Sequence, residues 1–274
     1  MNTDSQLKKE KGSSRLYVYP FGLEQMDLDQ QIKFINRIGF RGFAWEGTDQ
    51  STKTRIEDFY SSRLTIENNL KIAGIYFFHN LDQNDDSLWM SLLPTLSKYK
   101  IPLWPVFSSK QQNRNDLLEE KLILMCDKAK EFGIDVIIYP HDASYEGSVP
   151  ISAEEALPFI QKLKKENLFL SFHLCHELRA GNVNRIKDAI QNVRPYIKLV
   201  SISGADTLLY QNRGEDWSDA IKPLGKGTFD TENFCQILKS CDYRGPVVLH
   251  TYGISEDPEI HFSGSLKIWE SYQQ

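Results

Sequence analysis

Residues 135–178 read DVIIYPHDASYEGSVPISAEEALPFIQKLKKENLFLSFHLCHEL and contain two short apolar runs on either side of a longer amphipathic segment. The runs at 135–140 and 168–174 are rich in β-branched and aromatic residues, which is typical of buried strands. The segment between them, 152–167, places apolar side chains at helical spacing. A helix between two strands returns the chain in the same direction, so the strands pair in parallel. The stretch therefore predicts one β-α-β unit.

The same alternation continues along the whole chain. Strand-like runs stand at 15–21, 40–46, 71–78, 101–107, 135–140, 168–174, 197–203 and 246–252. Helical patterns stand at 28–39, 55–70, 86–99, 115–133, 152–167, 184–196, 231–245 and 267–273. Eight units favour a closed (β/α)8 barrel, an α/β fold of one domain over residues 16–274, after a flexible polar lead-in at 1–15. An open doubly wound sheet is disfavoured because the first strand ends in YPFGLEQ and lacks a glycine-rich phosphate loop.

Composition excludes several classes of protein. The formal net charge is −5, and neither sign is concentrated in one block, which argues against a nucleic-acid partner. No apolar run approaches the roughly 18 residues of a membrane span, and the N-terminus lacks the apolar core of a signal peptide. The four cysteines lack C-x-x-C spacing and are expected to be reduced and mostly buried. We therefore expect a cytoplasmic protein without a membrane partner, and a homo-oligomer is compatible with the sequence.

Five of the six histidines fall at or just after predicted strand ends. In β/α barrels the active site lies at the C-terminal ends of the strands, where the loops converge. A single histidine there is more often a hydrogen-bonded wall residue, but five at one rim favour a shared active site. Glu46 and Glu146 can reach the same mouth. The five histidines are His79, His141, His173, His176 and His250.

The sixth strand carries two of these histidines within SFHLCHEL, residues 171–178. If the strand continues through His173, this side chain points into the barrel, and His176 follows where the backbone begins to turn. The two imidazoles are then expected to face one point. A Cys175–His176 nucleophile pair is the competing interpretation, but adjacent side chains in extended backbone face opposite ways and no third group is evident. Cys175 is therefore expected to pack behind the strand.

The chain resembles the xylose-isomerase-like TIM barrels, a group that contains sugar isomerases, sugar epimerases and endonuclease-IV-like enzymes. The resemblance runs from about residue 16 to 255 and rests on the order of several short motifs. IGFRGFAWEG stands at the second strand, KIAGIYFFHN at the third, IIYPHDASYEG at the fifth, FHLCHEL at the sixth and ISGAD at the seventh. The most specific pair is IKPLGKGTFD followed by YRGPVVLHTYG, a glycine-containing turn, a helix and a Gly-Pro that opens the last strand.

Members of this family typically hold a divalent ion by a Glu after the fifth strand, an Asp and a His three residues later on the sixth, a His on the seventh and a Glu on the eighth. The corresponding positions in this chain are Tyr139 with His141 nearby, His173 and His176, Ser201 or Ser203, and His250. Imidazoles favour Zn²⁺ over the Mg²⁺ or Mn²⁺ that carboxylates hold. The resemblance therefore implies either Zn²⁺ at His173, His250 and His141 or His176, or a metal-free site with histidines as acid and base. No nucleotide cofactor is expected.

The function implied by the resemblance is isomerisation or epimerisation of a small carbohydrate by proton transfer next to a carbonyl, with β-elimination as a related reaction. In the family, the glutamates of the fifth and eighth strands also act as bases on opposite faces of the reacting carbon. In this chain the groups that could take their place are His141, Glu146, His176 and His250. Aromatic side chains can stack on a sugar, Glu46 can accept hydrogen bonds from hydroxyls and Lys226 can meet an anionic group. The substrate-binding candidates are Tyr19, Trp45, Glu46, His79, Tyr139, Trp217, Lys226 and Tyr252.

Other functions remain open at this point. A carbohydrate-binding barrel without turnover would bind sugar but exchange no substrate protons with solvent. A keto-sugar lyase or hydrolase would use the same fold. A DNA-repair endonuclease is the least supported. Such enzymes have a metal cluster held by His, Asp and Glu ligands and basic loops that bind phosphates, and this chain has few residues of either kind at the corresponding positions. The long, helix-poor connection at 205–229 is typical of a lid or a substrate wall.

Overall fold

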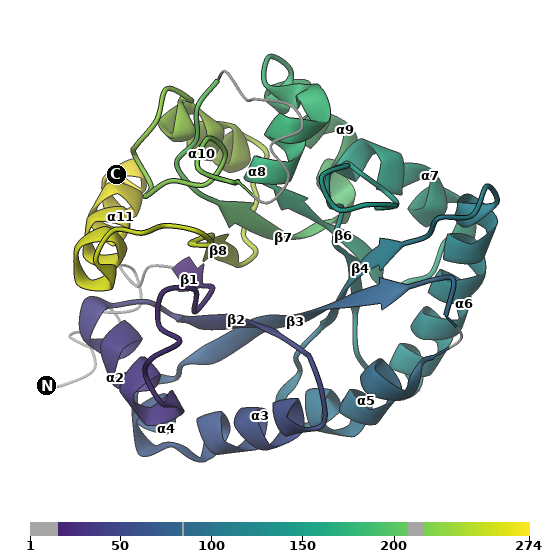
Figure 1. Ribbon diagram of the computed structural model, residues 1–274, viewed down its shortest axis with the longest axis horizontal. Helices are drawn as coiled ribbons and strands as arrows, with labels where there is room; N and C mark the ends of the chain where they lie inside the picture. Colours follow the sequence, from purple (N-terminus) through teal and green to yellow (C-terminus); the bar gives the residue numbers. More distant parts are fainter. Residues whose placement is uncertain (1–15, 84, 208–215) are drawn as a thin grey trace, which may run out of the picture.

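The computed structural model describes residues 16–83, 85–207 and 216–274. Eight parallel strands pair in sequence order and the last closes on the first, which confirms the predicted (β/α)8 barrel (Figure 1). The lead-in predicted at 1–15 lies outside the described residues, as do residues 208–215 of the predicted lid. The strands are β1 (Leu16–Val18), β2 (Gly42–Glu46), β3 (Lys71–Asn80), β4 (Leu103–Ser108), β5 (Val136–Ile138), β6 (Leu168–His173), β7 (Ile197–Ile202) and β8 (Val247–Leu249).

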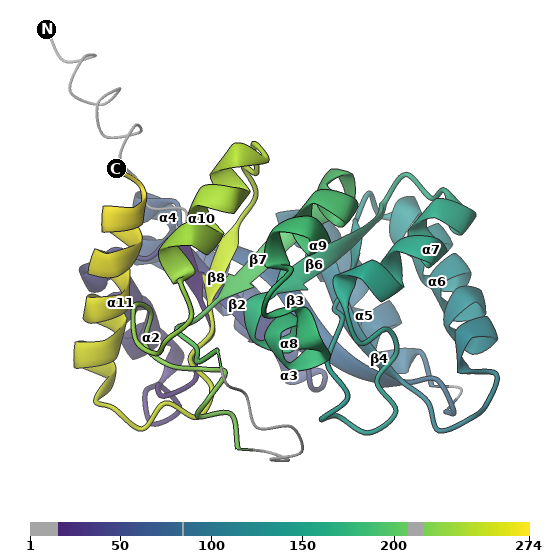
Figure 2. The same cartoon turned by 90° about the horizontal axis from the view of Figure 1, so that it is seen from above.

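The helices surround the strands as an outer ring, and Figure 2 shows several of them along the outside of β6, β7 and β8. The pattern predicted as one helix at 55–70 forms two, because Ser62 between them has extended backbone. The helices are α2 (Leu28–Ile38), α3 (Ser51–Ser61), α4 (Arg63–Asn68), α5 (Ser87–Tyr99), α6 (Arg114–Glu131), α7 (Ala153–Leu163), α8 (Leu174–Glu177) with the π-helical turn Leu178–Asn182, α9 (Ile186–Val193) with the 3₁₀ turn Arg194–Tyr196, α10 (Thr231–Ser240) and α11 (Pro258–Tyr272).

Side chains alternate between the barrel interior and the layer beneath the helices. On β6, Leu170 and Phe172 pack outward into the main hydrophobic core. Ser171 points inward, where its hydroxyl accepts a hydrogen bond from the Trp104 indole at 2.8 Å and donates to the Ile138 carbonyl at 3.1 Å. The interior is therefore filled by side chains at this level, and cavities open where the strands begin and where they end.

Gly42 shows how closely the first strands of the barrel approach one another. Its φ of 149° lies in the region that favours glycine, and a Cβ at this position would come within 1.7 Å of the Lys71 carbonyl oxygen. Gly42 pairs with Lys71 in the parallel ladder between β2 and β3. This close approach fixes the register of β2 against β3, and Glu46 is the last residue of β2.

The cysteines and the helices of the described residues bear on what the sequence predicts about disulfides and membrane spans. All four cysteines are buried and free, as expected. Within the described residues, none of the helices has the combination of length and apolar character that crossing a bilayer requires.

Candidate active site

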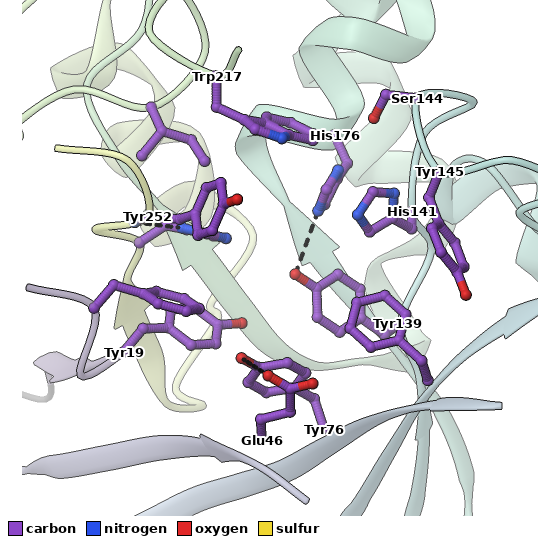
Figure 3. A pocket seen from close by; sticks show the side chains of 14 residues that line it. Tyr19, Glu46, Tyr76, Tyr139, His141, Ser144, Tyr145, His176, Trp217 and Tyr252 are labelled. Carbon is purple, nitrogen blue, oxygen red and sulfur yellow. Dashed lines mark hydrogen bonds between the residues drawn. The ribbon is translucent and has the colours of Figure 1, made fainter. Parts of the chain in front are cut away.

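A cavity of about 500 Å³ opens at the C-terminal ends of the strands (Figure 3). This volume is in the range of small-molecule sites, and this end of the barrel is where such sites lie. Aromatic rings make up most of its wall, and polar groups converge from several strands. The lining residues are Tyr19, Phe21, Glu46, Tyr76, Phe78, Tyr139, His141, Ser144, Tyr145, His176, Trp217, Ile221, His250 and Tyr252.

Two histidines on one wall share a single carboxylate. The Nδ1 atom of His176 lies 3.1 Å from Oδ1 of Asp142, and Nδ1 of His141 lies 3.5 Å from the same oxygen. The two imidazole centroids are 4.0 Å apart. On the other side of the His176 ring, Nε2 is 3.3 Å from the Tyr139 hydroxyl. A carboxylate on Nδ1 fixes the orientation of an imidazole and leaves Nε2 available toward the cavity.

The electrostatics of this wall follow from burial. Burial, together with the neighbouring His176, lowers the pKa of His141 to about 3. Burial alone would raise the pKa of Asp142, but the hydrogen bond and charge of His176 lower this pKa to about 2. Burial also holds the pKa of His250 well below its usual range. At neutral pH the wall therefore presents a neutral His141, a neutral His250 and an ionised Asp142.

Glu46 lies on the opposite side of the cavity from His176 (Figure 3). It ends β2, and its carboxylate accepts a hydrogen bond from the Tyr76 hydroxyl at 3.3 Å. Burial raises the pKa of Glu46, and the hydrogen bond from Tyr76 offsets part of this effect. The carboxylate is therefore more basic than one in water, which suits a group that moves a proton near neutral pH.

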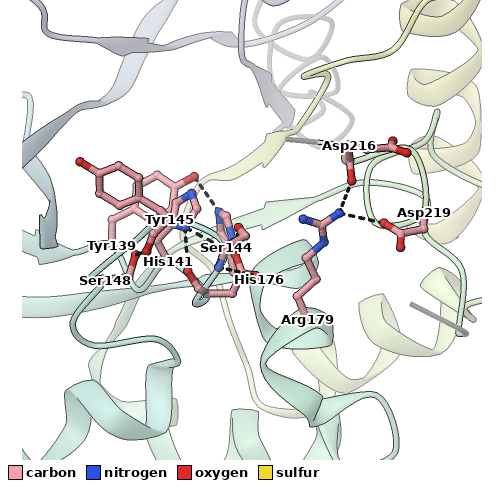
Figure 4. Close-up of polar contacts among 10 residues, drawn as sticks. Tyr139, His141, Ser144, Tyr145, Ser148, His176, Arg179, Asp216 and Asp219 are labelled. Carbon is pink, nitrogen blue, oxygen red and sulfur yellow. Dashed lines mark hydrogen bonds and ion pairs between the residues drawn. The ribbon is translucent and has the colours of Figure 1, made fainter. Parts of the chain in front are cut away.

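Trp217 forms the wall above the histidines (Figure 3), and Arg179, which Figure 4 shows with Asp216 and Asp219, holds it there. The Arg179 guanidinium lies 3.7 Å from the centroid of the Trp217 ring. Its Nη2 atom also donates to the Asp216 carbonyl and lies 2.9 Å from the Asp219 carboxylate. Because these contacts come from residues on both sides of Trp217, they fix the indole over the cavity.

His173 does not line the cavity. Its ring stacks on Tyr139 with centroids 3.7 Å apart and lies against Trp104 below the cavity floor. Both ring nitrogens are buried and have no hydrogen-bond partner among the described residues. The predicted metal pair of His173 and His250 is not assembled, because Tyr139 covers the His173 ring and no group of metal-ligating atoms in the described part of the chain contains His173.

Four other predicted residues lie away from the cavity. Trp45 and His79 point outward because each is next in sequence to an inward-facing residue, and strand side chains alternate. Trp45 packs against Phe43 and Phe59 in the core, and His79 lies 3.7 Å from Asp86. Glu146 is exposed and forms an ion pair with Lys110, and Lys226 is exposed in a turn.

The remaining predicted residues do meet at one cavity, from five separate strand ends and the seventh loop. They are Tyr19, Glu46, Tyr139, His141, His176, Trp217, His250 and Tyr252. The sequence analysis missed several others: Asp142, Tyr76, Phe78 and Arg179. Alternation of side chains along the third strand would have placed Tyr76 and Phe78 inward. No local sequence pattern predicts the role of Asp142 or Arg179.

Among residues 16–83, 85–207 and 216–274, two groups of side chains could hold a metal ion, and both contain His176. They are His141–Asp142–His176 and Cys175–His176–His250, each with three ligand atoms within 4.8 Å of one another. Four-coordinate Zn²⁺ with bonds of about 2.0–2.1 Å requires ligand atoms roughly 3.3 Å apart, which the distances around Asp142 match. Burial raises the pKa of the Cys175 thiol, which disfavours the thiolate that the second group needs. The first group therefore fits a divalent ion better.

A family model of the xylose isomerase-like TIM barrel matches residues 32–264. No curated protein sequence matches the chain. The solved structure of apo 3-keto-D-glucoside 4-epimerase YcjR from E. coli has a TM-score of 0.72 at 14% identity, covering 94% of this chain and 99% of that one. D-psicose 3-epimerase with D-tagatose, from Clostridium cellulolyticum H10, has a TM-score of 0.68 at 14% identity, covering 94% and 95%. The probable 3-DHS dehydratase AsbF from Bacillus anthracis also has a TM-score of 0.68 at 14% identity, covering 92% and 97%. Because the family model spans most of the sequence, the chain belongs to the xylose isomerase-like TIM barrel family.

Proposed function

We propose that this protein is a sugar isomerase or epimerase that transfers a proton next to a carbonyl group. The observation that carries the proposal is the placement of Glu46 across one aromatic-walled cavity from His176 and its partner Asp142. Two solved structures of the same fold are titled as sugar epimerases, which supports a small carbohydrate as substrate. The cavity size and the ring of tyrosines suit a sugar.

In the proposed reaction Glu46 removes the proton from the carbon next to the carbonyl. Partial burial raises the pKa of this carboxylate, which makes it a stronger base than a fully solvated glutamate. The Tyr139 hydroxyl, 3.3 Å from Nε2 of His176, then donates a hydrogen bond to the substrate oxygen on which negative charge develops. His176 donates to the same oxygen from Nε2 in the imidazolium form, whose charge the Asp142 carboxylate at Nδ1 balances. Asp142 is a positioning residue, because it holds His176 through Nδ1. Glu46 can return this proton to the neighbouring carbon, as isomerisation requires, or His176 on the opposite side of the cavity can deliver one from the other face, as epimerisation requires. His141 and His250, which are neutral, can accept hydrogen bonds from substrate hydroxyls.

Exchange of substrate hydrogen with solvent tests this proposal. Ketoses and 3-keto sugars are incubated with the protein in heavy water and followed by proton NMR. We expect loss of one carbon-bound proton signal next to the carbonyl in at least one of them, and no such loss with Glu46→Gln. Sugar binding without any exchange would instead support a non-catalytic barrel, and a dehydrated product would support a lyase. Cleavage of an abasic DNA duplex would contradict the proposal altogether.

We further propose that the divalent ion for which the site offers ligands is Zn²⁺, held by His141, Asp142 and His176. The positions that carry carboxylates in the resembling enzymes hold Tyr139, His173 and His250 here. The proposed ligands, two imidazoles and one carboxylate, favour Zn²⁺ over Mg²⁺ or Mn²⁺. With Zn²⁺ bound, Nδ1 of His176 and the Asp142 carboxylate would both be ligands in place of their hydrogen bond, and the ion would supply Lewis-acid polarisation of the substrate oxygen.

Calorimetric titration of the metal-stripped protein checks this assignment without an activity assay. We expect about one equivalent of Zn²⁺ to bind and Asp142→Asn to weaken binding at least about tenfold, while Mg²⁺ gives no binding heat. Asp127→Asn, the same change at an exposed carboxylate that pairs with Lys165 and belongs to neither ligand group, is the control and should bind Zn²⁺ normally. Equal binding of Mg²⁺, or Zn²⁺ affinity unaffected by Asp142→Asn, would contradict the assignment.

A further inference from the structure

A second cavity, of about 630 Å³, opens beside the candidate active site. It lies between the loop that follows β1, the end of β2 and one face of α3. It shares Phe21, Glu46 and Tyr76 with the first cavity, so these three residues form a wall common to both. The two cavities therefore adjoin at Glu46, and a molecule whose reacting carbon lies beside this carboxylate is next to the second cavity.

The polar groups of the second cavity include both hydrogen-bond donors and acceptors. Sugar hydroxyls donate and accept at once, so a mixed lining of amide, hydroxyl, guanidinium and carboxylate groups satisfies them better than a lining of one kind. Phe21 adds an apolar ring face of the kind that packs against the carbon skeleton of a sugar. The polar lining residues are Glu24, Gln31, Glu46, Thr48, Ser51, Thr54, Arg55, Asp58 and Tyr76.

Arg55 is the central donor of this cavity. Its guanidinium lies 4.3 Å from the centroid of the Trp45 ring, and Nη2 donates to the Gln31 side-chain oxygen at 3.2 Å. Over the resolved ranges of the chain, Arg55 takes part in none of the ion pairs. A guanidinium has five N–H groups, so Arg55 is held in place by its stacking and one hydrogen bond while other donors remain for a ligand.

The charge of the lining decides between a neutral and an anionic ligand. Three carboxylates, Glu24, Glu46 and Asp58, line the cavity against the single cation Arg55. A phosphate group would meet repulsion from these carboxylates, whereas a neutral sugar would use them as acceptors. We propose that the second cavity binds a second sugar ring, so that the substrate is a glycoside or disaccharide. This proposal rests on the proposed function in that Glu46 belongs to both cavities.

Equilibrium binding tests the second cavity independently of turnover. Sucrose, maltose, cellobiose and lactose are compared with glucose, fructose, galactose and glucose 6-phosphate by isothermal titration calorimetry. We expect at least one disaccharide to bind at least about tenfold more tightly than either of its component sugars. Arg55→Met, which removes the guanidinium but keeps a long unbranched side chain beside Trp45, and Asp58→Asn should each remove about tenfold of that affinity and leave monosaccharide binding within about twofold.

Arg63→Met is the matched control, because Arg63 is an exposed arginine on the next helix, paired with Glu67 at 2.6 Å, and lines neither cavity. It should not alter disaccharide affinity. The proposal is overturned if no disaccharide exceeds its component sugars, if Arg55→Met and Asp58→Asn weaken monosaccharides and disaccharides equally, or if glucose 6-phosphate binds most tightly. Selective disaccharide binding without proton exchange would uphold the second cavity and reject the proposed reaction.

Discussion

His176→Gln is expected to lower kcat by about 10²–10⁴-fold, the usual contribution of a positioned acid–base or hydrogen-bonding side chain. His176 faces the cavity through Nε2, near the Tyr139 hydroxyl, and is held from behind by Asp142. Glutamine has similar length and can still contact Asp142, but it cannot take up or release a proton. The effect should therefore appear in kcat, with a smaller change in KM, and it is measured by steady-state kinetics on the sugar identified by the exchange screen.

His79→Gln provides the matched control for this experiment. His79 is buried like His176 and belongs to β3, but its side chain points outward to Asp86 and does not line the candidate active site. We expect kcat of the folded variant to stay within about twofold of the original protein, because a side chain that points away from the barrel interior does not contact substrate. Similar losses in the two variants would show that the His176 effect is structural, and retained kcat in His176→Gln would remove this residue from the mechanism.

The fold could be predicted from the sequence because its signals are local and repeated. Each strand is a short apolar run, each helix has apolar side chains at regular spacing, and parallel pairing follows from their alternation. The rule that strand ends build the site then located most of the cavity residues, including Glu46, Tyr139, His141 and His176. These residues are close in space because the closed barrel brings distant strand ends together.

The errors in the predicted site come from the direction of individual side chains. Trp45 and Glu46 are consecutive on β2, so only one of them can point inward, and the structure places Glu46 there. His79 follows the inward-facing Phe78 and therefore points outward. His173 does point inward, but it lies one layer too deep and is covered by Tyr139. Depth and orientation depend on where a strand stops, and sequence patterns place such boundaries only within a few residues.

Asp142 and Arg179 could not be found from the sequence for a different reason. An aspartate after a strand end and an arginine in a helical turn are both common on protein surfaces. Their importance lies in partners from other elements: Asp142 holds His176 from the sixth strand, and Arg179 holds Trp217 from the seventh loop. These contacts become visible only when the loops are placed in space.

Acidification below pH 6.5 is expected to destabilise the protein steeply, and His79 allows this to be tested outside the active site. Burial, with a contribution from Lys121, lowers the pKa of His79 to about 4, against about 6.5 in the unfolded chain. Between these two values the unfolded state binds a proton that the folded state does not. The free energy of unfolding therefore falls as the pH decreases, by up to about 1.4 kcal/mol per pH unit from this residue and by up to about 3 kcal/mol in all.

Other histidines act in the same direction, because burial also lowers the pKa of His141, His173, His250 and His261. Asp142 works in a separate range: its lowered pKa stabilises the fold above pH 3.8 and this stabilisation is lost only as the pH falls through about 2. Urea unfolding at several pH values between 7 and 4 should therefore show a smaller pH slope for His79→Gln than for the original protein. Equal slopes, or an NMR titration in which folded His79 protonates near pH 6.5, would show that the folded state accepts this proton and that the burial of His79 does not govern acid stability.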